Sequence, residues 1–356
     1  MATVINVVSG KGGTGKTLMS AVLADMLGGL GLNVVVVDLD IFVRGLTVLL
    51  YFHKRESLNL VSAPQASVAD LFINKNDVLI GRKYHLGISR YRSFDVLPAV
   101  HRIDQTLNFP DIVPSTRAEA TKVLEVLLSS IPKTYDVVIL DSRAGYDELI
   151  AATHSVSTAS ICVEEEDGIS RVTADNLINQ LKNDAPTPLF RLTNKARKIE
   201  SLGDLEREAR GITELGRVPF DIDVMNSFGE QDFWEGISRS LYRVALSRAW
   251  NRFAVKLGLP WELKETRLSP FVSDRIEVHL ATFTLRDRVL LVYGILLGVS
   301  GLVLGFFDHD TLMFFFRDPI RVMAAAIGLI GLAMSVFAIL RLGRRPRDAT
   351  SLKYKD

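Results

Sequence analysis

The sequence predicts an α/β fold with a doubly wound, mainly parallel sheet, followed by a two-helix transmembrane hairpin. Short apolar runs rich in β-branched residues alternate with helical patterns, and a glycine-rich loop follows the first run. Two runs of nineteen residues without a formal charge, 289–307 and 322–340, lie near the end of the chain. The first two observations favour the sheet, and the third favours the hairpin.

The composition limits the class of protein. The 356 residues, about two domains' worth, are 48% hydrophobic and 23% charged, which excludes a disordered or collagen-like chain. Forty-two Lys and Arg residues nearly balance 41 Asp and Glu residues, so the net charge does not indicate a nucleic-acid partner. Because Cys162 is the single cysteine, one chain cannot form an internal disulfide or a cysteine-rich zinc or iron–sulfur site.

The glycine-rich loop lies between a predicted strand and a predicted helix. Residues 3–8 (TVINVV) are typical of a buried parallel strand, and a helical pattern begins at residue 18. Between them, residues 10–17 fit the P-loop pattern G-x-x-x-x-G-K-[ST] completely. The glycines let backbone N–H groups turn toward phosphate oxygens, Lys16 supplies a positive charge, and Thr17 provides a ligand for Mg²⁺. The predicted nucleotide-binding residues of this loop are Gly10, Lys11, Gly12, Gly13, Thr14, Gly15, Lys16 and Thr17.

The lysine directly after the first glycine, Lys11, is not needed by the ordinary motif. The string KGGTGKT resembles the deviant Walker A motif of the MinD/ParA family of ATPases. The resemblance covers roughly residues 2–256, with strong motifs within the first 145. It implies ATP and Mg²⁺ as ligands, ATP hydrolysis, and a homodimer on ATP binding in which Lys11 reaches the nucleotide of the partner subunit. Such a contact is physically favourable because each lysine neutralises phosphate charge in the opposite site.

Two further stretches carry the resemblance. Residues 33–44 (NVVVVDLDIFVR) form a predicted strand that ends in Asp38 and Asp40, and they resemble the first switch region. Residues 134–145 (TYDVVILDSRAG) form a second predicted strand that contains Asp141, and they resemble the Walker B and second switch regions. The resemblance implies that Asp141 holds the hydration shell of Mg²⁺, that Asp40 orients the attacking water, and that Asp38 supports it. Helix capping is the alternative for strand-end carboxylates. The expected catalytic residues are Lys11, Lys16, Asp38, Asp40 and Asp141, and the expected metal ligands are Thr17, Asp40 and Asp141.

Three later positions are weaker candidates. The resemblance makes Asn194, after a predicted strand at 187–193, a contact of the adenine edge, with an ordinary turn asparagine as the alternative. Residues 216–221 (GRVPFD) resemble a segment that closes over the base, which adds Pro219. Arg143 stands where many relatives have proline; a partner contact and a solvated side chain are equally favoured there, with a phosphate contact a further alternative.

Two charged stretches have less specific interpretations. The acidic run at 164–167 is typical of a solvated turn, with a partner contact as the alternative. Residues 238–252 form a basic helical pattern, for which DNA binding is a minor hypothesis, so nucleic acid is not an expected partner.

The apolar runs predict a bilayer contact through residues 289–340. At 1.5 Å per residue each run spans roughly 28 Å as a helix, and buried core helices are the alternative. Arginines precede the first run and follow the second, whereas the loop between them carries more acids than bases. No basic region precedes the first strand, so no signal peptide is expected. These patterns predict a multi-pass protein of the inner membrane with both termini in the cytoplasm.

The predicted organisation has six segments: an ATPase domain (1–257), a juxtamembrane linker (258–288), a first transmembrane helix (289–307), a short external loop (308–321), a second transmembrane helix (322–340) and a basic cytoplasmic tail (341–356). The predicted function is a membrane-anchored ATPase whose ATP-dependent dimerisation and hydrolysis recruit or position an unidentified protein partner. The alternatives are a membrane-linked ATPase resembling bacterial tyrosine kinases and a non-hydrolysing, nucleotide-bound scaffold.

Overall fold

The computed structural model describes residues 2–74, 83–108, 114–196, 212–221, 224, 227–228, 233–238, 240–264, 277–278 and 352–353. The chain divides into two units, Met1–Arg267 and Leu268–Asp356. In the second unit the described residues form an antiparallel pair of two short strands, β9 (Glu277–Val278) and β10 (Leu352–Lys353). The segment boundaries predicted from the sequence stay predictions.

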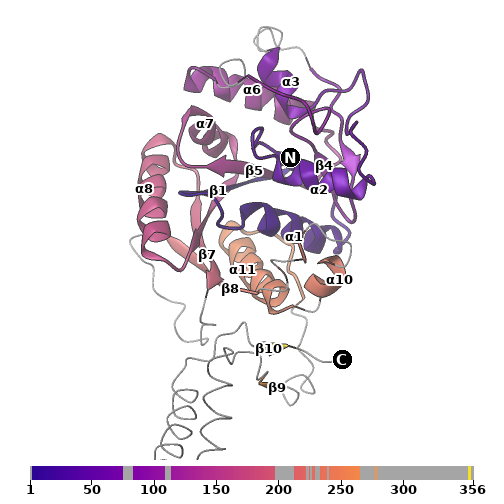
Figure 1. The fold of residues 1–356 in the computed structure, drawn as a ribbon. Helices are drawn as coiled ribbons and strands as arrows, with labels where there is room; N and C mark the ends of the chain where they lie inside the picture. The colour runs from indigo at the N-terminus through magenta and orange to yellow at the C-terminus, as the bar shows by residue number, and fades with distance from the viewer. Residues whose placement is uncertain are drawn as a thin grey trace, which may run out of the picture. The chain divides into compact units, whose positions relative to one another are not determined.

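The first unit contains an eight-stranded sheet with the strand order β3-β4-β2-β5-β1-β6-β7-β8 (Figure 1). β3 pairs with β4 in antiparallel fashion, and the other neighbouring pairs are parallel. This arrangement confirms the predicted α/β class and mainly parallel sheet. The strands are β1 (Thr3–Ser9), β2 (Val34–Asp38), β3 (Ser89–Arg90), β4 (Asp95–Leu97), β5 (Val137–Ala144), β6 (Ala159–Glu165), β7 (Leu189–Ala196) and β8 (Thr213–Pro219).

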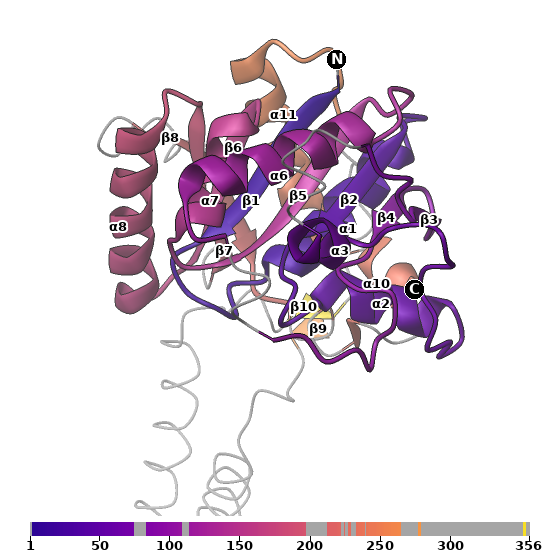
Figure 2. The same ribbon diagram turned by 90° about the horizontal axis from the view of Figure 1, so that it is seen from above.

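Helices cover both faces of the sheet, so the first unit has three layers (Figures 1 and 2). One face carries α1 (Lys16–Gly28), α2 (Gly45–His53), α10 (Phe233–Ser238) and α11 (Leu241–Leu257). The other face carries α3 (Val68–Ile73), α6 (Arg117–Ser130), α7 (Glu148–Val156) and α8 (Gly168–Asp184). Because the central strands are buried on both faces, their sequences are continuous apolar runs.

The predicted membrane segments, 289–307 and 322–340, lie outside the described residues. Within the part of the chain that the structure describes, no helix is both long and apolar enough to span a bilayer. The longest helices of that part, α8 and α11, have 17 residues each and carry charged side chains, and their apolar residues pack against the sheet. The prediction of a multi-pass inner-membrane protein with both termini in the cytoplasm is contradicted by this finding, and we withdraw it.

Candidate nucleotide-binding site

The P-loop joins β1 to α1 at the carboxyl edge of the parallel strands. Gly13 and Gly15 have φ angles of 80° and 85°, a backbone region that glycine adopts with little strain. Gly15 is the N-cap of α1, so the free N–H groups of the first helical turn begin at the loop. A Cβ atom on Gly10 would lie 2.3 Å from the backbone carbonyl carbon of Thr173 in α8. Glycine at position 10 therefore lets the loop pass close to α8.

Lys16 contacts the end of β1, and Thr17 contacts β5. The buried Lys16 ammonium donates a hydrogen bond to Ser9 Oγ over 2.8 Å. Burial lowers the pKa of Lys16, while the charges of Asp141 and Asp40 oppose that shift. Thr17 Oγ1 donates to Asp141 Oδ2 over 2.7 Å. Burial raises the pKa of Asp141 to about 6, and the hydrogen bond from Thr17 opposes the rise.

The Thr17 hydroxyl and the Asp141 carboxylate fit a bound Mg²⁺ ion. Mg²⁺ prefers oxygen ligands, and in nucleotide sites it is held by one or two protein oxygens together with phosphates and water. Within the described ranges there is no cluster of three or more His, Cys, Asp or Glu side chains suited to a metal held by protein alone. Two protein oxygens, from Thr17 and Asp141, suit a metal that is also held by nucleotide phosphates.

Asp38 is the last residue of β2, and its register partner is Asp141, which lies within the neighbouring strand β5. Asp38 is fully buried, and its Oδ2 accepts hydrogen bonds from the N–H and the Oγ1 of Thr47, over 2.8 and 2.7 Å. Burial, together with the nearby Asp141 charge, raises the pKa of Asp38 to about 7. The carboxylate thus holds the first turn of α2, which is the helix-capping role considered for strand-end acids.

Asp40 lies in the loop that follows β2, and it is less buried than Asp38. Its Oδ1 accepts a hydrogen bond from the N–H of Val43 over 3.1 Å, and its own N–H donates to Asp38 Oδ1 over 3.2 Å. The two switch carboxylates therefore have different surroundings: Asp38 faces the core, and Asp40 stays at the open side.

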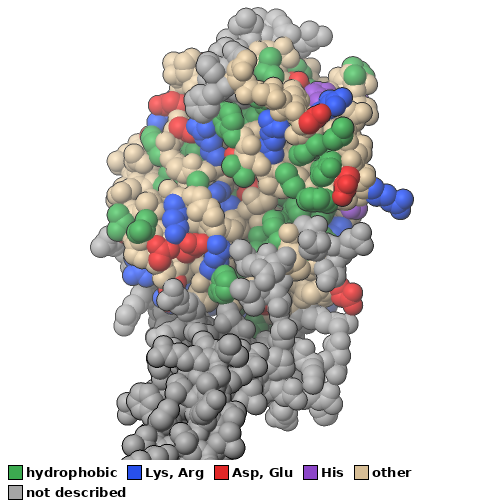
Figure 3. Space-filling model, viewed as in Figure 1, with side chains coloured by type: hydrophobic (Ala, Val, Ile, Leu, Met, Phe, Trp, Pro, Cys, Tyr) green, Lys and Arg blue, Asp and Glu red, His purple; other side chains and the backbone are tan. Residues whose placement is uncertain are grey.

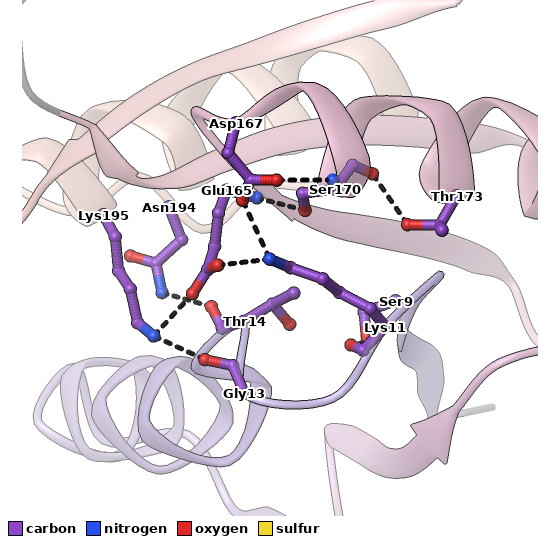
Figure 4. A network of polar contacts seen from close by, with 10 residues as sticks. All are labelled: Ser9, Lys11, Gly13, Thr14, Glu165, Asp167, Ser170, Thr173, Asn194 and Lys195. Carbon is purple, nitrogen blue, oxygen red and sulfur yellow. Dashed lines mark hydrogen bonds and ion pairs between the residues drawn. The ribbon is translucent and has the colours of Figure 1, made fainter.

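Lys11 extends toward the start of α8 (Figure 4). Its ammonium lies 2.8 Å from Glu165 Oε2 and 2.8 Å from Asp167 Oδ2. The hydrogen bonds to Asp167 and Glu165 raise the pKa of Lys11, so the side chain is charged. Asp167 is also the N-cap residue of α8, and its side chain accepts a hydrogen bond from the N–H of Ser170. In this structure the charge of Lys11 is thus neutralised within its own chain.

The end of β7 approaches the P-loop from the other side. The buried Asn194 donates from Nδ2 to the carbonyl oxygen of Thr14 over 2.8 Å. Lys195 donates to the carbonyl oxygen of Gly13 and forms an ion pair with Glu165. Pro219, at the end of β8, is a register partner of Ala196. The structure therefore places Asn194 against the loop backbone, while Pro219 lies one strand further along the sheet.

Arg143 forms an ion pair with Asp147, the N-cap residue of α7. Burial lowers the pKa of Arg143, and the charge of Asp40 opposes the shift. The side chain is therefore partly buried and paired, rather than freely solvated. Within the basic stretch 238–252, Arg243 pairs with Asp25 and Arg252 donates to a backbone carbonyl, so both arginines contact the fold itself.

Comparison with known proteins identifies the family. Residues 2–183, about half of the chain, match the family model described as an AAA domain. The chain belongs to this AAA-domain family. Among curated relatives it resembles the septum site-determining protein MinD of Bacillus subtilis, with 29% identity over 189 residues, 52% of this chain and 61% of the relative. The chain thus spans about three fifths of that relative's length.

Solved structures of MinD and of a partition protein share the fold of this AAA-domain chain. MinD of Pyrococcus horikoshii, complexed with Mg-ADP, has 19% identity and a TM-score of 0.51, covering 72% of this chain and 98% of its own. A putative plasmid partition protein of Borrelia burgdorferi bound to AMPPNP has 16% identity and a TM-score of 0.52, covering 72% and 100%. The family match and these likenesses confirm the prediction of a MinD/ParA-like P-loop ATPase fold.

Sequence reasoning missed that the acidic run at residues 164–167 is part of the AAA-domain site. All four of its acids have basic partners: Glu164 faces Arg191, Glu165 faces Lys11 and Lys195, Glu166 faces Arg217, and Asp167 faces Lys11. On the face drawn in Figure 3, acidic and basic side chains lie against one another in the area between α8 and α1. The missed signal was positional, because the run follows a parallel strand and so ends at the same sheet edge as the P-loop.

Proposed function

We propose that this chain binds and hydrolyses ATP with Mg²⁺, and that ATP binding joins two copies through their P-loop faces. The observation that carries the proposal is the 2.7 Å hydrogen bond between Thr17 and Asp141 beside the buried Lys16 ammonium. It brings two oxygen ligands and one cation together at the start of α1. The P. horikoshii relative complexed with Mg-ADP supports the choice of ligands.

The residues of the chain have separate tasks in this proposal. The N–H groups of the P-loop and of the first turn of α1 bind the phosphates, and Lys16 neutralises the charge that develops on the transferred group. Thr17 and Asp141 hold the metal and its water. Mg²⁺ held there would offset the negative charge of the nucleotide's phosphates. Asp40 orients the attacking water, so that catalysis depends on positioning rather than on a strong base.

Two observations support dimerisation through the same face. Lys11 is a charged side chain beside the P-loop whose partners are two surface carboxylates, so it can exchange them for phosphate oxygens of a second copy. Ile169 and Val172 in the first turns of α8 are 72% and 59% exposed, which places apolar surface next to Lys11. A face that pairs with itself uses each residue twice, once from each copy.

The nucleotide-dependent dimer acts in this proposal as a switch that recruits or positions a protein partner. The printed name of the B. subtilis relative, a septum site-determining protein, supports a positioning role. A phosphate-release assay on the full-length chain separates this proposal from a non-hydrolysing scaffold, and a phosphotyrosine assay separates it from a kinase.

The test is the molar mass of the full-length chain, measured by light scattering with Mg-ADP and with Mg-ATP. Asp40→Ala is included to slow hydrolysis, Lys11→Ala to remove the exchanged charge, and Lys133→Ala as a control at an exposed lysine. We expect a doubling of mass with ATP alone, retained in Asp40→Ala and Lys133→Ala and lost in Lys11→Ala. A monomer in every nucleotide, despite measured ATP binding, would refute the dimer.

A further inference from the structure

We infer that four buried polar side chains, Ser142, Asn6, Ser160 and His154, fix the irregular part of β5 that follows Asp141 and thereby position the Asp141 carboxylate for a metal. These four side chains are called the polar row below. The inference rests on the proposed binding of Mg²⁺ with ATP. It assigns positioning residues that belong to β1, β6 and α7, on the face of the sheet opposite α1.

Polar side chains are unexpected inside β1 and β6, because both strands are buried on both faces and otherwise carry apolar runs. Asn6 and Ser160 are nevertheless fully buried, and they are register partners in the β1–β6 pair. A buried polar group costs free energy unless it is hydrogen-bonded. Two such groups at paired positions therefore indicate a bond between the side chains of the two strands.

Hydrogen bonds join the polar row from β5 to α7. Ser142 Oγ donates to Asn6 Oδ1 over 2.7 Å, and Asn6 Nδ2 donates to Ser160 Oγ over 3.2 Å. Ser160 Oγ lies 2.8 Å from Nδ1 of His154. Burial lowers the pKa of His154, so its imidazole is neutral at pH 7. Because Ser160 Oγ already accepts from Asn6, we assign its own hydrogen to Nδ1.

The backbone ladder of β5 is irregular immediately after Asp141. Asp141 is the register partner of Val7 in β1. Two residues further along β1, Ser9 is paired with Ala144, which lies three residues beyond Asp141. The register with β2 ends at Asp141. One extra residue of this kind is a β-bulge, which disrupts the ladder locally and changes the direction of nearby side chains. The ladder therefore fixes Ser142 less firmly than the earlier residues of β5.

The polar row supplies a contact for this bulge from the face of the sheet opposite to the metal ligands. Asp141 contacts α1, where it accepts from Thr17 Oγ1 and Ser20 Oγ over 2.7 and 3.1 Å. Ser142 contacts Asn6, on the α7 side of the sheet. Consecutive residues of a strand point to opposite faces and turn together with the backbone. A fixed Ser142 side chain therefore also fixes the direction of the Asp141 carboxylate.

Each member of the polar row depends on the next. All four side chains are buried, so water does not replace a lost partner, and removing one leaves its neighbour unsatisfied. A fully bonded buried network holds its members rigidly. His154 thus supports Ser160, which supports Asn6, which holds Ser142 beside the metal ligand. Groups that orient a ligand in this way tune metal affinity without touching the metal.

The experiment measures how nucleotide affinity depends on Mg²⁺. Anisotropy of a fluorescent, non-hydrolysable ATP analogue gives the affinity of the full-length chain over a range of free Mg²⁺ concentrations and in EDTA. The variants are Asn6→Leu, which interrupts the polar row, and the pair His154→Leu and His154→Asn. Thr153→Val is the matched control, because it removes a buried hydroxyl of the same helix that donates to the Leu149 carbonyl. Thermal unfolding without ligand reports whether each variant is folded.

We expect Asn6→Leu to raise the Mg²⁺ concentration for half-maximal binding by about tenfold, because a metal ligand loses a group that orients it. Affinity in EDTA stays unchanged. His154→Leu gives a smaller shift in the same direction, because it acts through two further hydrogen bonds. His154→Asn returns toward the wild-type value, because its side-chain carbonyl replaces Nδ1 as the acceptor. Thr153→Val leaves the Mg²⁺ dependence unchanged.

An unchanged Mg²⁺ dependence in folded Asn6→Leu would overturn the inference, as would an equal shift in Thr153→Val, since either result would assign the polar row to stability alone. If Asn6→Leu does not fold, the His154 pair decides, and the same Mg²⁺ dependence in His154→Leu and His154→Asn would overturn the inference. A wild-type chain without Mg²⁺-dependent nucleotide binding would overturn the proposed function. The two failures are distinguishable because only the first leaves wild-type binding intact.

Discussion

Lys11 and Asp167 form an ion pair within one chain, with 2.8 Å between Nζ and Oδ2, although 155 residues separate them. Glu165 is a second partner of the same ammonium. Before Lys11 can bind the phosphates of a second copy, as proposed, it must break its ion pairs with these two carboxylates. The intrachain pairs therefore oppose dimerisation, and weakening them shifts the balance toward the dimer.

We predict that Glu165→Gln together with Asp167→Asn lowers the ATP concentration needed for half-maximal dimerisation. Both groups are partly exposed, and such pairs contribute little individually, so the expected change is less than about fivefold. Asparagine still caps α8, which keeps the helix intact. Light scattering over an ATP titration measures the shift, with Glu125→Gln as the control at another surface ion pair. Weaker dimerisation in the double variant would contradict the prediction.

The raised pKa values of Asp38 and Asp141 predict how the free energy of unfolding depends on pH in the absence of ligand. Burial raises the pKa of both carboxyls from 3.8, to about 7 and about 6. Between about pH 4 and pH 7 the folded chain therefore holds protons that the unfolded chain has released, and the free energy of unfolding falls as the pH rises. The contribution of these two groups is greatest below the unfolded pKa and is lost as the pH approaches 7.

Asp38→Asn tests this pH dependence. The amide oxygen still accepts from Thr47 but does not titrate, so the difference in unfolding free energy between pH 5 and pH 7.5 shrinks by about 1 kcal/mol or more. Denaturant titrations at the two pH values measure it. Asp136→Asn is the comparison, at a half-buried carboxyl that directly precedes β5 at the opposite edge of the sheet and accepts a hydrogen bond from the N–H of Asn33. An unchanged difference between the two pH values would show that Asp38 is not protonated in the fold.

Arg143 is predicted to favour ATP over ADP. It follows Asp141 by two residues in β5, where the register with β1 is irregular, and its charge interacts with Asp40. We expect Arg143→Ala to weaken ATP binding by about tenfold and ADP binding by much less, because the lost cation lies toward the γ-phosphate end of the site. Isothermal titration with both nucleotides measures the ratio. Equal losses for the two nucleotides would assign Arg143 to the Asp147 pair alone.

The sequence predicts the central sheet and the P-loop well because both depend on local patterns. β1, β2, β5 and β6 are buried on both faces, so their sequences are apolar runs, and residues 10–17 carry the whole motif in eight positions. The region between α2 and α6 was not predicted. Its strands β3 and β4 have only two and three residues, too few to show a periodic pattern.

The parts of the candidate site that the sequence could not predict are joined across the sheet. Glu165 and Lys195 reach the P-loop because β6 and β7 follow β1 in the strand order. Lys195 and Gly13, for example, are 182 residues apart along the chain. No local pattern encodes such a contact. The expectation that Asn194 contacts the adenine edge came from the family resemblance and stays a prediction; in the structure its Nδ2 donates to the loop carbonyl of Thr14.

Substitutions at Gly10 and Gly12 together test whether the P-loop packs on α8. A Cβ atom at position 10 would lie 2.3 Å from the Thr173 carbonyl carbon and 2.7 Å from the Ala174 nitrogen, which are backbone atoms of a buried helix turn. At position 12 the same atom would meet nothing within 4 Å. We expect Gly10→Ala to lower the free energy of unfolding by about 2 kcal/mol and Gly12→Ala to change it by less than about 0.5 kcal/mol. Denaturant titration of the two variants measures the contrast. Equal stabilities would mean that the loop does not pack on α8 in solution, and the positions of Lys11 and Glu165 would then need a different explanation.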